Sequence, residues 1–222
     1  MKKELIIISG PQAAGKSTII ANVCAHLQAL SPVLESGRHK MPLMFPLQES
    51  RQIIAHKEML LGAIFMTQAQ EEWVAECDLA RMDIMRRPSS RKIIYLDECN
   101  IFTIAHARAH GIKDIYRHWK DYMWRLEELN AKVIFLDIDP ELSWERRWRK
   151  YEQRLVYFHA NQHKSIMKRY RDYLNKLRPA LLEVYEKLPL QKEFVDARVP
   201  EKVVLQQVIG ALSKLSGLIK TH

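Results

Sequence analysis

Five short apolar runs punctuate this chain of 222 residues, and long helical patterns separate them. The runs lie at residues 5–9, 32–35, 92–97, 132–137 and 193–196. The third and fourth contain Ile93-Ile94-Tyr95-Leu96 and Val133-Ile134-Phe135-Leu136, which are apolar on both faces, as expected of strands covered by helices on each side. We therefore predict an α/β fold, in which a doubly wound, five-stranded parallel sheet lies between two helical layers.

The segments between these runs predict helices. Between the second and third runs, apolar or long side chains recur at helical spacing, with a break allowed at Gly62; they are Leu60, Ile64, Met66, Gln70 and Trp73. Further helices are predicted at residues 114–130 and 200–218. Asp139 followed by Pro140 predicts a helix start, because proline suits the first helical position. Pro42 and Pro46 predict a loop.

The first run leads directly into Gly10-Pro11-Gln12-Ala13-Ala14-Gly15-Lys16-Ser17, which fits the pattern G-x-x-x-x-G-K-[ST]. A strand, a small-residue loop and a helix start form the context in which this pattern binds nucleotide phosphates. Backbone N–H groups and the helix N-terminus attract the anion, Lys16 reaches the outer phosphates, and Ser17 offers a hydroxyl to magnesium. The predicted nucleotide-binding residues are Gly10, Pro11, Gln12, Ala13, Ala14, Gly15, Lys16, Ser17 and Thr18.

Length and composition indicate a single domain spanning residues 1–222. With 47% hydrophobic and 27% charged residues, the composition is that of a globular protein and excludes the disordered and fibrous classes. The five-residue apolar run near the N-terminus is too short for a signal peptide or a membrane span. Cys24, Cys77 and Cys99 are odd in number and widely spaced, which argues against disulfides or structural zinc. We expect a cytoplasmic protein without membrane contact.

Positive charge is concentrated in one part of the chain. The formal net charge is +9, and residues 141–178 contain eleven Lys or Arg against four Asp or Glu. Three interpretations remain open: an arginine-bearing lid at about residues 141–160, a nucleic-acid face, or a solvated helix surface. A phosphate loop itself requires basic partners for a transferred phosphoryl group, which favours the lid.

Candidate catalytic groups follow the predicted strands, where ligands bind in such sheets. Asp97 ends the third strand and is assigned to magnesium together with Ser17; Glu98 follows it and is assigned to the substrate. Either acid also suits a helix cap. After the second strand, Glu35 is a candidate base for the acceptor hydroxyl, and Arg38 a candidate partner for an anionic acceptor. A surface ion pair between Glu35 and Arg38 is the structural alternative.

The basic segment supplies the candidate arginines. Helical spacing places Arg147, Lys150 and Arg154 on one face and Arg146 and Arg149 on another. The planar guanidinium suits an oxygen-rich transition state better than an ammonium group does. The predicted catalytic residues are therefore Lys16, Glu35, Asp97, Arg147, Arg149 and Arg154.

The chain resembles the thymidylate kinase and deoxynucleoside kinase group of P-loop kinases over most of its length. The resemblance rests on the phosphate loop, on Asp97-Glu98-Cys99-Asn100-Ile101-Phe102 followed by Ala105-His106-Ala107, and on Leu136-Asp137-Ile138-Asp139-Pro140-Glu141 before the arginine-rich segment. Val195-Asp196-Ala197 is similar to the family's adenine-side loop. The resemblance implies that Glu35 is the general base, that Asp97 is the strand-end acid, and that Arg147, Arg149 and Arg154 belong to the lid.

Three positions depart from the family pattern. Glu98 replaces the family's arginine, Gln12 replaces the acid of many thymidylate kinase loops, and Gln68 replaces an arginine that binds the acceptor phosphate. Because a desolvated anion needs cationic partners, these losses weaken the case for a monophosphate acceptor unless Arg38 or Arg81 compensates. Gln70 remains able to form paired hydrogen bonds with a base edge.

These features predict an ATP- and Mg²⁺-dependent kinase of a small acceptor, a nucleoside or a nucleoside monophosphate. Two alternatives remain: a phosphotransferase acting on a sugar or an antibiotic, and a nucleotide-dependent switch that binds nucleic acid or a protein partner. The absence of an N-K-x-D sequence argues against a GTPase switch. A homodimer is compatible with the sequence, which does not set the oligomeric state.

Overall fold

A parallel sheet forms the centre of the computed structural model, which describes residues 3–29, 43–47, 66–88, 93–98 and 100–216. Its strands are β1 (Lys3–Ser9), β2 (Leu43–Leu47), β3 (Ile93–Glu98), β4 (Lys132–Asp137) and β5 (Gln191–Asp196). They lie in the order β2-β3-β1-β4-β5, and each neighbouring pair is parallel. The central strand β1 therefore delivers the phosphate loop, residues 10–17, to the middle of the sheet's carboxyl edge.

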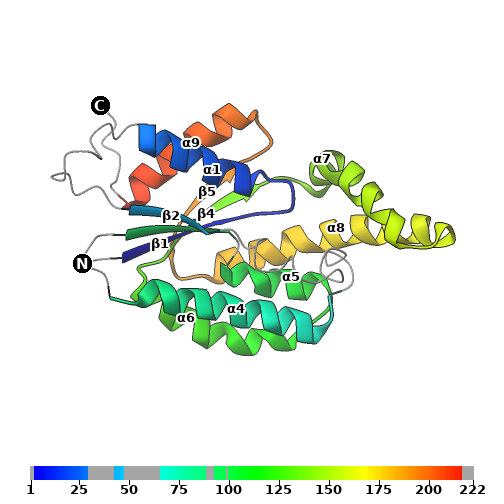
Figure 1. Cartoon of the computed structure of the whole chain (residues 1–222), viewed down its shortest axis with the longest axis horizontal. Coiled ribbons are helices and arrows are strands. Elements are labelled where there is room, and N and C mark those ends of the chain that lie inside the picture. The colour runs from blue at the N-terminus through cyan, green and yellow to red at the C-terminus, as the bar shows by residue number, and fades with distance from the viewer. Residues whose placement is uncertain (1–2, 30–42, 48–65, 89–92, 99, 217–222) are drawn as a thin grey trace.

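Helices cover both faces of this sheet (Figure 1). One face carries α1 (Lys16–Ala29) and α9 (Glu201–Ser216), and the other carries α4 (Gln68–Arg86), α5 (Thr103–Ala109), α6 (Trp119–Glu128) and α8 (His163–Lys187). Helix α7 (Pro140–Gln153) lies beyond the carboxyl edge beside the outer part of α8. Short 3-10 turns occupy Asn100–Phe102, Asp114–His118, Arg154–Tyr157 and Ala160–Gln162.

Side chains that point alternately to the two faces of the sheet form two hydrophobic cores, one on each face. In β1, Leu5 and Ile7 pack with the residues of α4, α5, α6 and α8, whereas Ile6 and Ile8 pack with those of α1 and α9. Strand β4 divides its side chains in the same way. Successive side chains of a strand point to opposite faces, so continuous apolar runs are required when both faces are covered. The predicted α/β class, with a parallel sheet between helical layers, is confirmed.

Strand β2 occupies a segment for which the sequence predicted a loop. The run at residues 32–35 lies outside the described residues, while β2 occupies 43–47, where Pro42 and Pro46 predicted a loop. The loop prediction is wrong for residues 43–47. Pro46 aligns with Leu96 of β3, and β2 stands at the end of the strand order. An edge strand tolerates proline because one side of its backbone needs no ladder hydrogen bond.

Most helix predictions are confirmed within small boundary shifts. Residues 114–130 form a 3-10 turn followed by α6, and the last helix, α9, begins one residue after Pro200. Helix α7 begins at Pro140, and Asp139 Oδ1 accepts a hydrogen bond from the N–H of Leu142 at 2.9 Å. Helix α4 begins at Gln68; Leu60, Gly62 and Ile64 of its predicted pattern lie outside the described residues. No helix in the described ranges is long and apolar enough to cross a bilayer.

Candidate active site

The phosphate loop joins β1 to α1 through three residues with positive φ. Gly10 has φ 147°, Ala13 63° and Gly15 85°. Gly10 is crowded as well as bent, because a Cβ atom there would lie 2.1 Å from the backbone oxygen of Leu136 in β4. Any side chain at position 10 would force β1 and β4 apart. The pattern's first glycine is therefore required by close packing between two strands as well as by backbone conformation.

Lys16 lies in the centre of the loop. Its side chain is 8% exposed, and its Nζ donates hydrogen bonds to the carbonyl oxygens of Gly10 and Pro11, each at 3.0 Å. An ammonium group has three donors, so these two bonds leave a third for a phosphate oxygen. The backbone at the start of the loop therefore binds the ammonium group of Lys16.

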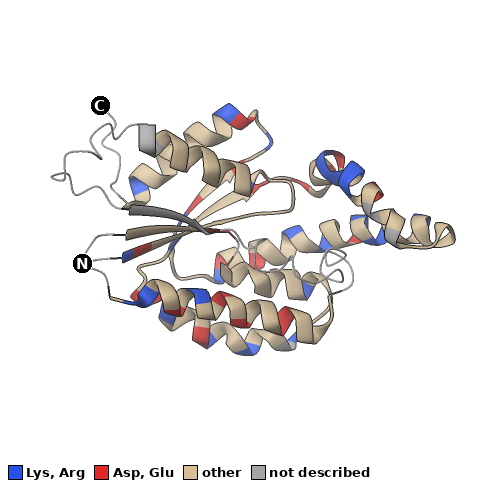
Figure 2. Ribbon diagram, in the orientation of Figure 1, with Lys and Arg blue, Asp and Glu red and all other residues tan. Residues whose placement is uncertain are grey.

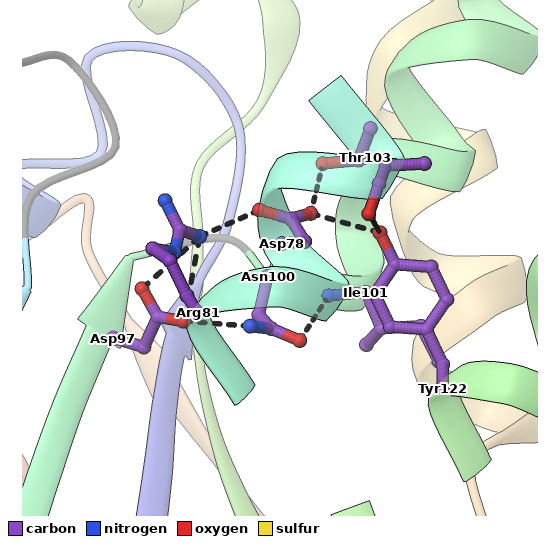
Figure 3. Close-up of polar contacts among 8 residues, drawn as sticks. Asp78, Arg81, Asp97, Asn100, Ile101, Thr103 and Tyr122 are labelled. Atoms are coloured by element: carbon purple, nitrogen blue, oxygen red, sulfur yellow. Dashed lines mark hydrogen bonds and ion pairs between the residues drawn. The ribbon is translucent and has the colours of Figure 1, made fainter. Parts of the chain in front are cut away.

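The carboxyl end of β3 carries a buried network of charged and polar groups (Figure 3). Asp97 is 0% exposed; it accepts a hydrogen bond from Asn100 Nδ2 at 2.6 Å, and Arg81 Nη2 lies 3.4 Å from both its oxygens. The same Arg81 nitrogen donates to Asp78 Oδ1 at 2.6 Å. Asp78 also accepts hydrogen bonds from Thr103 Oγ1 at 2.7 Å and from the Tyr122 hydroxyl at 2.9 Å. Helices α4, α5 and α6 are thereby joined to the end of β3.

Two carboxylates share one guanidinium in this network. Burial raises the pKa of Asp78, Arg81 lowers it, and Asp97 raises it again. Burial also raises the pKa of Asp97, against the opposing effect of Arg81. The directions agree because desolvation penalises a carboxylate charge more than one shared cation compensates.

Glu98 lies on the other side of the strand from Asp97. Its Oε2 accepts a hydrogen bond from Ser17 Oγ at 2.7 Å, and its side chain is half-buried. Glu98 pairs in register with Ile8, two residues before the phosphate loop. The second acid of the Asp-Glu pair is therefore the one that contacts the loop's hydroxyl.

Gln12 connects the phosphate loop to α7. Its Oε1 accepts hydrogen bonds from Arg147 Nη1 at 3.1 Å and from the Tyr151 hydroxyl, and its backbone oxygen accepts one from Ser143 Oγ. Tyr151 is fully buried and stacks on Tyr170 of α8 at a centroid distance of 4.0 Å. These contacts bring Arg147 to the loop, and its role in a lid stays a prediction.

Arg146 crosses the opposite side of the loop. Its Nη1 donates to the backbone oxygens of Ala197, at 3.1 Å, and Ala13, at 3.4 Å. It borders a cavity of about 240 Å³ whose lining includes Ala13, Gly15, Thr18, Arg146, Ala197 and Val199. Ala197 is the last residue of Val195-Asp196-Ala197, which the resemblance assigns to the adenine side, and it therefore lies beside the loop.

The remaining predicted residues have different surroundings. Arg149 is exposed and lies over the Trp148 ring, 5.6 Å from its centroid. Gln70 caps α4, where its Oε1 accepts a hydrogen bond from the N–H of Thr67 at 2.8 Å. Arg154 belongs to a 3-10 turn after α7, and the structure does not describe its side chain. Glu35 and Arg38 lie outside the described residues, so their roles stay predictions.

Two sets of α7 residues contact the loop. Ser143, Arg147 and Tyr151, each one helical turn from the next, contact Gln12. Arg146, which helical spacing put on a different face from Arg147, contacts the backbone oxygen of Ala13. Figure 2 shows α7 and the adjoining part of α8 rich in Lys and Arg. One end of this basic surface thus reaches the candidate nucleotide site.

A chain of buried and partly buried titratable groups links α4 and α8 with α5 and the residue that follows it. Tyr173 hydrogen-bonds to His106 Nδ1 at 2.6 Å and stacks on His110, whose Nε2 lies 3.5 Å from Glu71 Oε1. Burial raises the pKa of Glu71 to about 8 and lowers that of His110 to about 4. The contact between them at neutral pH is therefore between uncharged groups. Burial, with Lys16 and Arg147 as further causes, lowers the pKa of His106 to about 3.

Sequence reasoning missed several of these residues. Gln12 was predicted to bind nucleotide and was noted as a departure from the family, but its contacts with α7 were not predicted. Ser143, Tyr151 and Asp78 were not singled out. The i, i+3 spacing of Asp78 and Arg81 is a usable signal for an ion pair on one helix, but nothing local indicates that Asp97 joins it. The clustering depends on how α4 packs against the sheet.

Comparisons with known proteins support the fold. No protein-family model matches the sequence, and a search of curated proteins found no similar one. Among solved structures, the chain is similar to deoxyadenosine kinase from M. mycoides with the products dCMP and dCDP, with a TM-score of 0.61 and 14% identity over 95% of this chain and 99% of that one. The same kinase with dATP gives 0.58 and 14% over 94% and 99%, and with dCTP 0.59 and 16% over 95% and 99%. The chain therefore shares its fold with these deoxyadenosine kinase structures.

Proposed function

We propose that this chain is a Mg²⁺-dependent kinase that transfers the γ-phosphoryl group of ATP to a small acceptor, a nucleoside or a nucleoside monophosphate. The observation that carries the proposal is the phosphate loop itself, with Lys16 at its centre, Ser17 against Glu98, and Arg147 held beside it by Gln12. Phosphoryl transfer depends on positioning and charge neutralisation, and these groups supply both. The likeness to deoxyadenosine kinase structures with bound deoxynucleotides supports the same reaction class.

Each group has a role in that reaction. The loop N–H groups and Lys16 bind the β- and γ-phosphates, and Arg147 neutralises charge on the transferring group. Magnesium, held by Ser17 and an acid of the Asp97-Glu98 pair, supplies further charge neutralisation at the phosphates. The donor base occupies the cavity bordered by Arg146 and Ala197. Glu35 takes the proton from the acceptor hydroxyl.

The surroundings of Arg81 favour a nucleoside over a monophosphate as acceptor. Arg81 was a candidate to replace the arginines that the sequence lacks, but Asp78 and Asp97 engage its guanidinium inside the protein. A phosphate placed there would compete with two carboxylates and would lose its hydration shell. Arg38, the other candidate, lies outside the described residues. On the surroundings of Arg81 we propose that the acceptor is a hydroxyl compound, with a nucleoside 5′-hydroxyl as the first choice.

A substrate panel tests this proposal. ADP release from ATP is measured with Mg²⁺ and each of the common ribo- and deoxynucleosides, their monophosphates, and representative sugars and aminoglycosides. We expect stimulation by at least one nucleoside, and loss of that stimulation in Lys16→Ala with an unchanged circular dichroism spectrum. Stimulation by sugars or aminoglycosides alone would replace the nucleoside assignment. A Lys16→Ala variant with full activity would contradict the role of the loop.

A further inference from the structure

The two acids at the end of β3 face different sides of the sheet. Side chains alternate along a strand, so neighbouring residues cannot share one environment. Asp97 turns toward α4, where it meets Arg81, whereas Glu98 turns toward α1, where it meets Ser17. Only one member of the pair therefore contacts the phosphate loop through its side chain.

The Asp97 carboxylate is bound by other side chains inside the protein (Figure 3). It has no exposed surface, Asn100 donates to its Oδ2 at 2.6 Å, and the guanidinium of Arg81 lies 3.4 Å from each oxygen. A divalent cation at this carboxylate would lie against the guanidinium, and like charges repel strongly where water is excluded. Asn100 has a φ of 30° and also accepts a hydrogen bond from the N–H of Ile101 through Oδ1, so the turn after β3 is built around this carboxylate.

Glu98 has the surroundings that a magnesium ligand sphere requires. A hydroxyl and a carboxylate are hard oxygen donors, and proteins bind Mg²⁺ through one or two carboxylates together with substrate phosphates and water. The Ser17 hydroxyl donates a hydrogen bond to Glu98, which leaves the lone pairs of the Ser17 oxygen available to a cation. The residues present therefore fit the ion, and the half-buried position of Glu98 leaves access from the phosphate side.

From this arrangement we infer that Glu98, and not Asp97, is the acid that holds the nucleotide's magnesium ion together with Ser17. The inference deepens the proposed function and rests on it. Asp97 is then a positioning residue that fixes Arg81 and Asn100 and so the end of β3. The sequence analysis assigned the metal to Asp97, whereas this inference assigns it to Glu98. It also gives a role to Glu98, which stands where the kinases that the chain resembles carry an arginine.

Calorimetry of ADP binding with and without Mg²⁺ tests the assignment without relying on turnover. In the unmodified protein, Mg²⁺ should tighten ADP binding by about 5- to 150-fold, the usual range of coupling between two ligands. Glu98→Gln keeps an acceptor for the Ser17 hydroxyl but removes the charge. It should reduce the magnesium effect to less than about threefold while leaving metal-free ADP affinity nearly unchanged.

Three further variants complete the experiment. Asp97→Asn should keep the magnesium effect, Glu98→Asp should restore part of it, and Glu128→Gln, at an exposed carboxylate paired with Arg86, should leave it unchanged. Electron paramagnetic resonance of Mn²⁺ with ADP gives a direct reading of bound metal. We expect bound Mn²⁺ in every folded variant except Glu98→Gln, with a reduced fraction in Glu98→Asp.

The outcomes separate the inference from the proposed function. A full magnesium effect in Glu98→Gln overturns the inference, as does its loss in a folded Asp97→Asn variant. If Asp97→Asn does not fold, the result for Glu98→Gln decides alone. Nucleotide binding without any magnesium effect in the unmodified protein refutes the metal assignment but not nucleotide binding. Absence of ADP binding under all conditions refutes the proposed function itself.

Discussion

Arg147 Nη1 donates a hydrogen bond to Gln12 Oε1 at 3.1 Å, across 135 positions of the sequence. A side-chain hydrogen bond therefore connects the phosphate loop to α7 without any bound phosphate. Tyr151 adds a second donor to the same oxygen and is itself packed against Tyr170. The position of Arg147 is thus set by a polar contact to the loop and by aromatic packing behind it.

Replacing Gln12 with alanine should loosen α7 without unfolding the domain. The change removes the acceptor shared by Arg147 and Tyr151, while both cores remain intact. We expect faster amide hydrogen exchange in residues 140–153, with a loss of global stability of about 1 kcal/mol or less. Gln153→Ala, at the exposed end of α7, is the control; equal exchange in the two variants would contradict the role of Gln12.

Arg147 and Arg149 should differ in their contribution to turnover. Arg147 contacts the loop, whereas Arg149 is exposed beside Trp148. We expect Arg147→Ala to lower kcat by about 100- to 1,000-fold, and Arg149→Ala by less than about tenfold. Steady-state kinetics with the best acceptor of the substrate panel measures both. Equal losses would show that α7 rearranges during catalysis to bring Arg149 to the phosphates.

Removing the Tyr122 hydroxyl should destabilise the buried network. Tyr122 donates to Asp78 Oδ2 at 2.9 Å, and its loss leaves a fully buried carboxylate with fewer donors. We expect Tyr122→Phe to lower the free energy of unfolding by about 1–3 kcal/mol. Tyr116→Phe, whose ring stacks on Trp119 outside this network, should cost less. Chemical denaturation of both variants measures this free energy. An unchanged value in Tyr122→Phe would mean that the hydrogen bonds from Thr103 and Arg81 are enough to stabilise the Asp78 carboxylate.

Glu71 should make stability depend on pH. Burial raises its pKa to about 8 in the folded protein, above the ordinary value of 4.5, so the folded state binds a proton that the unfolded state releases. Stability from this group is complete below about pH 4.5 and is lost as the pH rises toward 8. Glu71→Gln does not titrate, so its stability relative to the unmodified protein should increase over this range, on the order of 3 kcal/mol.

Denaturant titrations at pH 5.5, 7 and 8.5 measure this difference. Glu72→Gln, one residue along α4 and partly exposed, provides the control. It retains Glu71, so its stability should fall with rising pH as that of the unmodified protein does. A difference between Glu71→Gln and the unmodified protein that stays constant with pH would mean that Glu71 is ionised in the folded state, paired with a charged His110.

The features that the sequence predicted are those determined by neighbouring residues. Strands β1, β3, β4 and β5 follow from apolar runs, the start of α7 follows from Asp139-Pro140, and the phosphate loop follows from its residue pattern. Each depends on interactions within a few residues, so local patterns suffice. Strand β2 was missed because Pro46 opposes it locally, while pairing with β3 decides its position.

The sequence alone did not predict that Asp97 contacts Arg81 while Glu98 contacts Ser17. Alternation implies that the two acids face opposite sides, but which side carries α1 depends on the handedness of the connections and the strand order. Arg81 is a similar case. The sequence allowed it to bind an acceptor phosphate, because its burial between Asp78 and Asp97 depends on the packing of α4, which local patterns do not predict.

The close approach of Gly10 to Leu136 has a consequence for how this chain can change over time. The hydrogen atom at position 10 occupies the space beside a β4 carbonyl, so any substitution of this glycine would disturb the neighbouring strand. At this residue, loss of the proposed nucleotide binding and loss of the folded sheet could therefore not be separated. A descendant that abandoned the proposed catalysis could replace Lys16 in a single step, yet it would still be expected to retain Gly10.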